Sequence, residues 1–244
     1  MRCVILSDIH ANLVALQAVL EDMRIRGGFD EIWCLGDIVG YGPEPHACIE
    51  LLQQYKTVSV AGNHDYAAVG RIDISSLNVD AAIACRWTAK QLTIEDVDYL
   101  QNLAVKVTQG NFTLVHGSPR LPLEEYLISA VDANDNFRYF DTKFCLVGHS
   151  HVPLVFQQDK NGNCFEADIP DTIQLKHECH RLIINPGGVG QPRDGDSRAS
   201  YALYDSDAQV VYHYRVGYDI GATQKRMMEC GLPASLSLRL NYGC

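Results

Sequence analysis

The chain lacks the features that mark secreted, disulfide-rich and membrane proteins. Its nine cysteines are an odd number and include no Cys-x-x-Cys pair, which disfavours a disulfide framework in a chain of 244 residues. No apolar run approaches the roughly 20 residues needed to span a bilayer. Asp8 follows Met1 too closely to leave room for a signal peptide before the first expected strand. We therefore expect reduced, mostly structural cysteines, no membrane contact and a cytoplasmic location.

Positive charge is also scarce. The chain has 20 Lys and Arg residues against 30 Asp and Glu residues, a formal net charge of -10, and no basic stretch. This balance disfavours nucleic acid as the main partner. An acidic protein that handles phosphates needs local positive charge, which bound metal ions can supply. Since 47% of the residues are hydrophobic and no repeat or low-complexity segment is visible, we expect one folded domain.

Short apolar runs alternate with amphipathic segments, which indicates an α/β fold. Strands are expected at residues 2–6, 31–35, 57–61, 112–115, 144–147 and 181–184, and helices at residues 11–27 and 43–55. Strand–helix–strand units join parallel strands through right-handed crossovers. The carboxyl ends of such strands meet at one edge, where open α/β sheets bind their ligands.

Five of the expected strands end in residues that can bind a metal ion or move a proton. In chain order these motifs are Asp8-Ile9-His10, Gly36-Asp37, Gly62-Asn63-His64-Asp65, His116 and Gly148-His149-Ser150-His151. Asp8 and His10 lie two residues apart, so in an extended segment they point to the same side and form part of a transition-metal shell. Taken alone, this pair is more typical of a solvated carboxylate and a buried core histidine. Recurrence at successive strand ends favours a common site.

The remaining segments complete the expected architecture. Residues 66–103 are mainly helical, with Asn78 and Thr93 as N-caps, and form an insert or cover. Hairpins are expected around Asn161-Gly162 and between residues 200–204 and 210–216. We expect a single domain over residues 1–244, with the insert at about 66–103 and a C-terminal hairpin and tail from about 199. Strands with helices on both outer faces suggest two sheets in α/β layers.

The five motifs, in this order, resemble the calcineurin-like metallophosphoesterase superfamily from residue 2 to at least residue 190. The resemblance implies a four-layer α-β-β-α sandwich with two mixed sheets and two divalent transition-metal ions, with Mn, Fe, Zn, Co or Ni as candidates. It assigns to the first ion Asp8, His10 and His151, to the second Asn63, His116 and His149, and to both the bridging Asp37. His64 matches the catalytic histidine, which protonates the leaving oxygen or stabilises the transition state.

Departures from the superfamily pattern narrow the expected activity. Gly36-Asp37 is followed by Ile38 and Val39, whereas Ser/Thr protein phosphatases of the superfamily continue with Asp-Arg. The Gly-rich residues 185–193 look like the phosphodiesterase branch, including diadenosine-tetraphosphate hydrolase-like members. The resemblance implies hydrolysis of phosphodiester or phosphoanhydride bonds in small nucleotide-like substrates, including dinucleoside polyphosphates, by a metal-bridging hydroxide. A phosphomonoesterase or phosphoprotein phosphatase, and more remotely a non-catalytic scaffold, are the alternatives.

Four polar residues near the motifs are candidates for substrate binding. The guanidinium groups of Arg120, Arg193 and Arg198 match phosphate geometry, although surface ion pairing is the alternative for each. Asn12 either contacts phosphate or caps the first helix. Asp65 either orients His64 or caps the segment that follows it.

Four further histidines have no expected catalytic role. His177-Glu178-Cys179-His180 offers potential ligands within four residues, but their spacing fits no single face. A solvated connection is the favoured interpretation of that cluster. For His46 and His213 the sequence indicates no partner.

Overall fold

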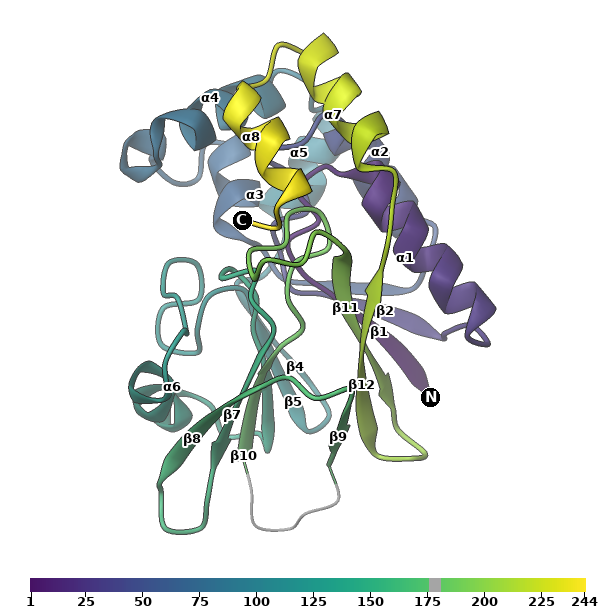
Figure 1. The fold of residues 1–244 in the computed structure, drawn as a ribbon. Helices are drawn as coiled ribbons and strands as arrows, with labels where there is room; N and C mark the ends of the chain where they lie inside the picture. Colours follow the sequence, from purple (N-terminus) through teal and green to yellow (C-terminus); the bar gives the residue numbers. More distant parts are fainter. Residues whose placement is uncertain (176–180) are drawn as a thin grey trace.

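The computed structural model describes residues 1–175 and 181–244, so the His177–His180 cluster lies outside the described residues. Two six-stranded sheets form the centre of the molecule, and helices gather at one end and along the outer faces (Figure 1). The predicted α/β class with two mixed sheets is confirmed. Within the described residues, no helix is long and apolar enough to cross a membrane.

The first sheet has the strand order β3-β2-β1-β11-β12-β9. Its strands are β1 (Arg2–Leu6), β2 (Glu31–Cys34), β3 (Thr57–Ser59), β9 (Thr172–Gln174), β11 (Ala199–Asp205) and β12 (Val210–Val216). β1, β2 and β3 pair in parallel, whereas β11, β12 and β9 add antiparallel ladders. The predicted crossovers between β1, β2 and β3 therefore place their carboxyl ends at one edge.

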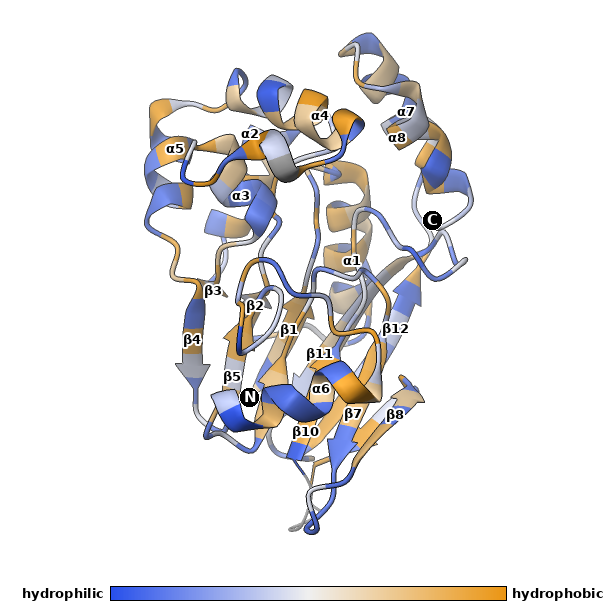
Figure 2. Ribbon diagram, turned by 90° about the vertical axis from the view of Figure 1, so that its left-hand side faces the viewer, coloured by the Kyte–Doolittle hydropathy of each residue, from blue (hydrophilic) through white to orange (hydrophobic). Residues whose placement is uncertain are grey.

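The second sheet has the strand order β4-β5-β6-β10-β7-β8. Its strands are β4 (Lys106–Gln109), β5 (Phe112–Val115), β6 (Phe144–Leu146), β7 (Leu154–Gln158), β8 (Cys164–Asp168) and β10 (Arg181–Asn185). β5, β6 and β10 pair in parallel. Figure 2 shows hydrophobic residues concentrated in β1 and β2, whereas the edge strand β4 is largely hydrophilic and alternates between exposed and half-buried positions.

Eight α-helices are described. They are α1 (Leu13–Ile25), α2 (Pro45–Gln53), α3 (Asn63–Ala68), α4 (Val79–Ala89), α5 (Ile94–Gln101), α6 (Ala130–Asn136), α7 (Ile220–Glu229) and α8 (Ala234–Leu238). Short 3₁₀ turns are η1 (Ile74–Ser76), η2 (Phe137–Tyr139) and η3 (Arg239–Asn241). Asn78 caps α4 and Thr93 caps α5, as the sequence predicts, and Thr93 and Asp96 form a capping box.

Three apolar clusters define four layers. The first packs α1 and α2 on the outer face of the first sheet and includes Leu16 and Val4. The second lies between the sheets, where Ile5 and Trp33 meet Leu114 of β5. The third covers the outer face of the second sheet with α6 and η2, including Phe137. Alternate residues of each strand point to opposite faces, so each sheet fills two of these clusters.

The structure corrects several boundaries and adds elements. The second helix begins at Pro45 and not at Pro43, and proline still occupies its first turn. β4, β9 and α6 have no counterpart among the expected elements, because short polar segments carry little periodic signal. The weakly patterned tail forms α7, α8 and η3. The described cysteines are free of disulfides.

Candidate metal centre

Six of the seven candidate ligands lie in loops at the carboxyl ends of strands from both sheets, and the seventh is the first residue of a helix. Asp8 and His10 follow β1, Asp37 follows β2 and Asn63 begins α3 after β3. His116 follows β5, and the remaining two histidines follow β6. The predicted meeting of strand ends therefore extends across both sheets.

Most of these ligands have a backbone conformation that L-residues rarely adopt. The φ angle is positive at five of the seven, namely Asp8 (54°), His10 (49°), Asp37 (51°), His149 (66°) and His151 (59°). Such conformations cost free energy and persist only where the surrounding structure enforces them. Here the main chain of the neighbouring loops does so: the His10 amide donates to the Asp37 carbonyl at 2.9 Å, and the Asp8 amide donates to the Gly36 carbonyl at 3.1 Å.

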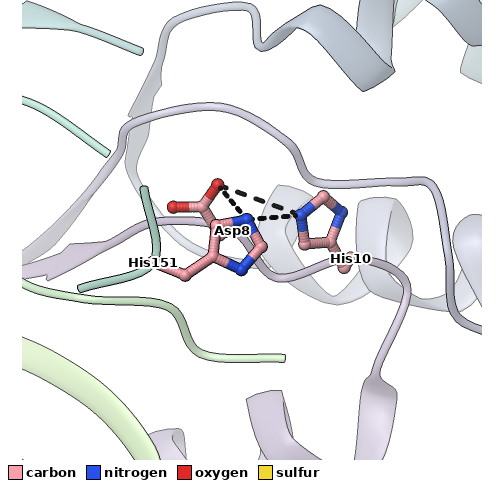
Figure 3. Close-up of side chains that lie close together, drawn as sticks. All are labelled: Asp8, His10 and His151. Carbon is pink, nitrogen blue, oxygen red and sulfur yellow. Dashed lines mark hydrogen bonds and ion pairs between the residues drawn. The ribbon is translucent and has the colours of Figure 1, made fainter. Parts of the chain in front are cut away.

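The first cluster consists of Asp8, His10 and His151 (Figure 3). The Asp8 Oδ1 atom lies 3.2 Å from His151 Nε2 and 3.9 Å from His10 Nε2. The two Nε2 atoms are 3.1 Å apart. All three side chains are buried, with at most 2% of each exposed.

The second cluster consists of Asp37, His116 and His149, with Asn63 beside it. The His116 Nε2 atom lies 3.3 Å from Asp37 Oδ2, 3.1 Å from Asn63 Oδ1 and 3.1 Å from His149 Nδ1. The ligand atoms of each cluster lie within 4.8 Å of one another.

The donor atoms of the first cluster fit a cation. His10 Nδ1 faces the Val39 carbonyl at 3.2 Å and His151 Nδ1 faces the Gln191 carbonyl at 2.5 Å, so each Nδ1 carries the proton and each Nε2 presents a lone pair. Burial lowers the pKa of both histidines, which keeps the rings neutral. Two lone pairs 3.1 Å apart repel unless a cation lies against them. Asp8 Oδ1, also buried, has no hydrogen-bond partner within the described part of the chain. A divalent metal would satisfy all three atoms.

Asp37 lies between the clusters. Its Oδ2 atom is 3.6 Å from His10 Nε2 and 3.3 Å from His116 Nε2, and its Oδ1 accepts a hydrogen bond of 2.8 Å from the His64 amide. Burial opposes ionisation, but the charge of His116 and its hydrogen bond outweigh it and hold the pKa of Asp37 well below its usual value. Asp37 is therefore ionised and faces ligands of both clusters. Gly62 allows this approach, since a Cβ there would lie 2.0 Å from Asp37 Oδ1.

The two histidines of the second cluster differ in their pKa values. Burial lowers the pKa of His149 to about 3, with the charge of His116 acting in the same direction. For His116 burial acts in the same way, but the ion pair with Asp37 outweighs it and raises the pKa to about 9. The pKa values of these two rings therefore shift in opposite directions within one buried site, a pattern typical of functional centres.

His64 lies beside the first cluster at the start of α3. Its ring centroid is 5.1 Å from that of His10 and 4.4 Å from that of Tyr41. Its Nδ1 atom is buried without a hydrogen-bond partner among the described residues. Burial lowers the pKa of His64 to about 4. Asp65 does not hold this ring: its carboxylate accepts from the amides of Gly62 and Val39, which completes the cap of α3.

The three candidate arginines differ in the groups that they contact. Arg193 lies beside Tyr41, with its guanidinium carbon 5.8 Å from the centroid of that ring and its Nη2 2.8 Å from Gln191 Oε1. Arg120 pairs with Glu125 and, at 3.6 Å, with Asp135, and Arg198 pairs with Asp196 at 2.6 Å.

Asn12 makes three hydrogen bonds to protein groups. Its Oδ1 caps α1 by accepting from the Ala15 amide at 3.2 Å, and it also accepts from Thr223 Oγ1 at 3.0 Å. Its Nδ2 donates to the Gly190 carbonyl at 2.9 Å. Asn12 therefore joins α1 to α7 behind the site.

Three rim residues carry no signal in the sequence motifs. The Tyr126 ring stacks on His149 with centroids 3.9 Å apart and is 47% exposed. The buried Tyr41 contacts both His10 and His64. Arg239, in the C-terminal turn η3, precedes Leu240, which lines a small cavity with His10 and Tyr41. Only their positions in space could identify them, since each comes from a loop or turn without a recognisable pattern.

Comparison with known families supports the interpretation that the geometry suggests. The family described as the calcineurin-like phosphoesterase superfamily domain matches residues 1–209. The chain belongs to this superfamily. Calcineurin-like phosphoesterases are metal-dependent phosphoester hydrolases, and this chain is one of them. Among the described residues, two buried clusters could hold divalent metals.

Individual relatives agree with this assignment. The crystal structure of a metallophosphoesterase from Sphaerobacter thermophilus is 49% identical, has a TM-score of 0.90, and covers 100% of this chain and 99% of that chain. An uncharacterized protein of Methanocaldococcus jannaschii is 38% identical over 98% of this chain and 97% of its own length. The phosphodiesterase YfcE of Escherichia coli is 26% identical over 86% of this chain and 91% of its own. A symmetrical bis(5'-nucleosyl)-tetraphosphatase of Haemophilus ducreyi is 28% identical over 54% of this chain and 52% of its own length.

Proposed function

We propose that this phosphoesterase hydrolyses phosphodiester or phosphoanhydride bonds of small, nucleotide-like substrates at a centre of two divalent transition-metal ions. Asp8, His10 and His151 would hold one ion, Asn63, His116 and His149 would hold the other, and Asp37 would bridge them. The observation that carries the proposal is the position of Asp37, whose Oδ2 atom faces a histidine of each cluster at 3.6 and 3.3 Å. A carboxylate with two oxygens and a negative charge can be shared between two cations.

The chemistry of the donor atoms indicates the kind of metal. Imidazole nitrogens with carboxylate and amide oxygens suit Mn, Fe, Zn, Co or Ni better than calcium, which takes six to eight oxygens. Two such ions at about 3.5–4 Å from each other acidify a shared water and neutralise the oxygens of a phosphoryl group. Asn63 contributes a neutral oxygen, so the protein ligands leave more of the positive charge available to substrate.

His64 would act on the leaving oxygen. Its pKa of about 4 makes the ring neutral at pH 7, so it can donate an N–H hydrogen bond to a developing negative charge. A bound phosphate would raise this pKa and favour proton transfer to the leaving group. The Nδ1 atom has no protein partner among the described residues, which leaves it free for that role.

Arg193 is the predicted substrate contact that the geometry favours. It is half-buried next to Tyr41 and has no carboxylate within ion-pair distance among the described side chains. Arg120 and Arg198 have acidic partners. Asn12 hydrogen-bonds Gly190, Ala15 and Thr223 within the fold. We therefore assign phosphate contact to Arg193 and structural roles to the other three.

A substrate panel with added Mn²⁺, run on the wild type and on His64→Ala, tests the proposal. It includes bis(p-nitrophenyl) phosphate, p-nitrophenyl phosphate, diadenosine tetraphosphate and a phosphopeptide. We expect metal-dependent cleavage that favours the diester or the tetraphosphate, and a loss of about 10²–10⁴-fold in turnover for His64→Ala with metal content unchanged. Preference for the monoester or the phosphopeptide would contradict the proposed substrate class and support a phosphomonoesterase or phosphoprotein phosphatase. Unchanged turnover of an unactivated substrate by His64→Ala would remove His64 from its role.

A further inference from the structure

Tyr126 covers one of the candidate metal ligands and leaves much of its own side chain in solvent. Its ring lies nearly parallel to the imidazole of His149, with an interplanar angle of 23° and ring centroids 3.9 Å apart. One face of the tyrosine therefore rests on His149. Because Tyr126 is nevertheless 47% exposed, its opposite face is open to solvent next to the second cluster.

The residues on either side of Tyr126 hold it in this position. Glu125 accepts a hydrogen bond from Asn136 Nδ2 at 3.0 Å and pairs with Arg120. Leu127 is buried in the apolar cluster on the outer face of the second sheet. The aromatic ring is thus fixed before any ligand binds, and a contact that is already ordered costs less entropy on binding.

The position of Tyr126 relative to the two clusters indicates which part of a substrate it can reach. Arg193, to which we assign phosphate contact, lies beside the first cluster, where its amide donates to the His151 carbonyl at 3.4 Å. Tyr126 lies beside the second cluster through its contact with His149. Asp37 faces both clusters. A substrate phosphate held between the clusters would therefore have a guanidinium group on one side and an aromatic face on the other.

We propose that Tyr126 is a stacking platform for a nucleobase of the substrate, and that it makes the site prefer phosphoesters that carry a base over those that do not. Any nucleobase can stack on a tyrosine ring, because every base has a π face, whereas a sugar or an alkyl group has none. The base would lie on the exposed face of Tyr126, with His149 on the other face. This inference rests on the proposed function, since it names a group that the nucleotide-like substrate presents to the same site.

Adenosine 5'-monophosphate and ribose 5-phosphate test this contact, because they share the sugar and the phosphate and differ in the base. Each compound is titrated calorimetrically into the Mn²⁺-loaded protein. We expect the wild type to bind adenosine 5'-monophosphate roughly tenfold more tightly, as for one stacked base. Tyr126→Leu should lose this preference, and Tyr126→Phe should keep it. Equal affinities in the wild type, or a preference that survives Tyr126→Leu, would contradict the platform.

A purely structural role for Tyr126 gives a different result. Leucine still covers His149 but has no aromatic face, so we expect Tyr126→Leu to keep its metal content and to bind ribose 5-phosphate within about twofold of the wild type. The proposal is wrong if this variant loses metal or binds both compounds more weakly by the same factor.

Tyr55→Leu is the matched control. Tyr55 is 39% exposed and packs on the Phe29 ring with centroids 5.3 Å apart. It precedes β3, so it lies at the opposite end of that strand from the metal centre. The control variant should bind both compounds as the wild type does, and a lost preference in Tyr55→Leu would contradict the assignment to Tyr126.

Hydrolysis distinguishes this inference from the proposed function. Tyr126→Leu should raise KM for diadenosine tetraphosphate by roughly tenfold with little change in kcat, because a base contact made equally in the ground state and the transition state contributes only to binding. A base preference that depends on Tyr126, in a protein that cleaves none of the panel substrates, would support the platform and contradict the proposed function. Cleavage of the diester or the tetraphosphate by a protein that binds the two compounds equally, or binds neither, would contradict the platform alone.

Discussion

The orientation of His64 depends on a residue without a side chain. Gly40 has a φ angle of +92°, and a Cβ at this position would lie 2.8 Å from His64 Nδ1 and 2.9 Å from its Cβ. Gly40 therefore supplies both a conformation that favours glycine and the space that the imidazole occupies. A side chain here would displace the ring from the metal clusters.

We predict that Gly40→Ala reduces turnover by about 10²-fold while both metal ions remain bound, because a misplacement of about 1 Å is enough for such a loss. Steady-state kinetics and metal analysis check this prediction. Gly70→Ala is the matched control: its φ is +73°, and nothing lies within 4 Å of the added Cβ. The control should lose stability without losing turnover, and equal turnover by both variants would contradict the role of Gly40.

His213 is a half-buried histidine outside the site, and its protonation is coupled to folding. Its Nε2 donates to Ser200 Oγ at 2.8 Å, and that hydroxyl donates to the Pro186 carbonyl at 2.5 Å. Burial lowers the pKa of His213 to about 4, with Arg215 acting in the same direction and Asp171 and Asp194 opposing it. The sequence indicated no partner for this residue, because Ser200 lies on the neighbouring strand.

Stability should therefore fall on acidification. The unfolded chain binds a proton at His213 near pH 6.5 and the folded chain only near pH 4, so this contribution is present above pH 6.5 and lost as the pH falls toward 4. We expect His213 to account for about 2 kcal/mol of the decrease in unfolding free energy between pH 7 and pH 5. Urea titrations of wild type and His213→Gln at both pH values measure it. An identical decrease in the variant would contradict the assignment.

At the scale of elements, one side chain, that of Asn12, caps the start of α1 and connects this helix to α7. Asn12 caps α1, hydrogen-bonds Thr223 of α7, and donates to the Gly190 loop. Capping residues interact within one turn and can be recognised from sequence, as Asn78 and Thr93 were. The contact with α7 links positions 211 residues apart, and no local pattern predicts such a contact.

We predict that Asn12→Ala lowers the free energy of unfolding by about 1–2 kcal/mol, since a cap and an interhelical hydrogen bond are lost. KM should change by less than about twofold, as expected for a capping residue. Asn12→Ser keeps a capping hydroxyl and should recover part of the stability. A large rise in KM with unchanged unfolding free energy would instead support phosphate contact by Asn12.

At the scale of the whole molecule, the candidate metal centre joins the two sheets. Asp8 and His10 extend from the first sheet and His151 from the second, and the other cluster likewise combines Asp37 with His116. Metal ions bound here would hold the carboxyl ends of both sheets together. Ligands that bind only the folded chain stabilise it by mass action.

We predict that Mn²⁺ at 100 times its dissociation constant raises Tm by roughly 5–10 °C, and that a chelator reverses the shift. Asp37→Asn should weaken the binding of both metal ions, because this carboxylate faces both clusters. Calorimetry together with metal analysis of the variant tests this. Loss of a single ion would contradict the bridging position.

The sequence alone determined the class of the fold and the order of its central strands and helices. Hydrophobic periodicity and capping residues are local, so they mark β1, β2, α1 and α5 without knowledge of the rest of the chain. Because the carboxyl ends of parallel strands meet at one edge of a sheet, the motifs that follow these strands were expected to form one site. The superfamily predicted from these motifs is confirmed. Local patterns carried this information because each motif directly follows its strand.

Only the tertiary structure decided which polar residues remain available to a substrate. Arg120 and Arg193 have the same chemistry, yet one meets Glu125 and the other meets no carboxylate among the described residues. The weakly patterned tail packs beside the site, where Leu240 lines a small cavity with His10 and Tyr41. The positive φ angles of the ligands are likewise set by contacts between loops. Such interactions join residues far apart in the chain, so their outcome depends on packing and not on local sequence.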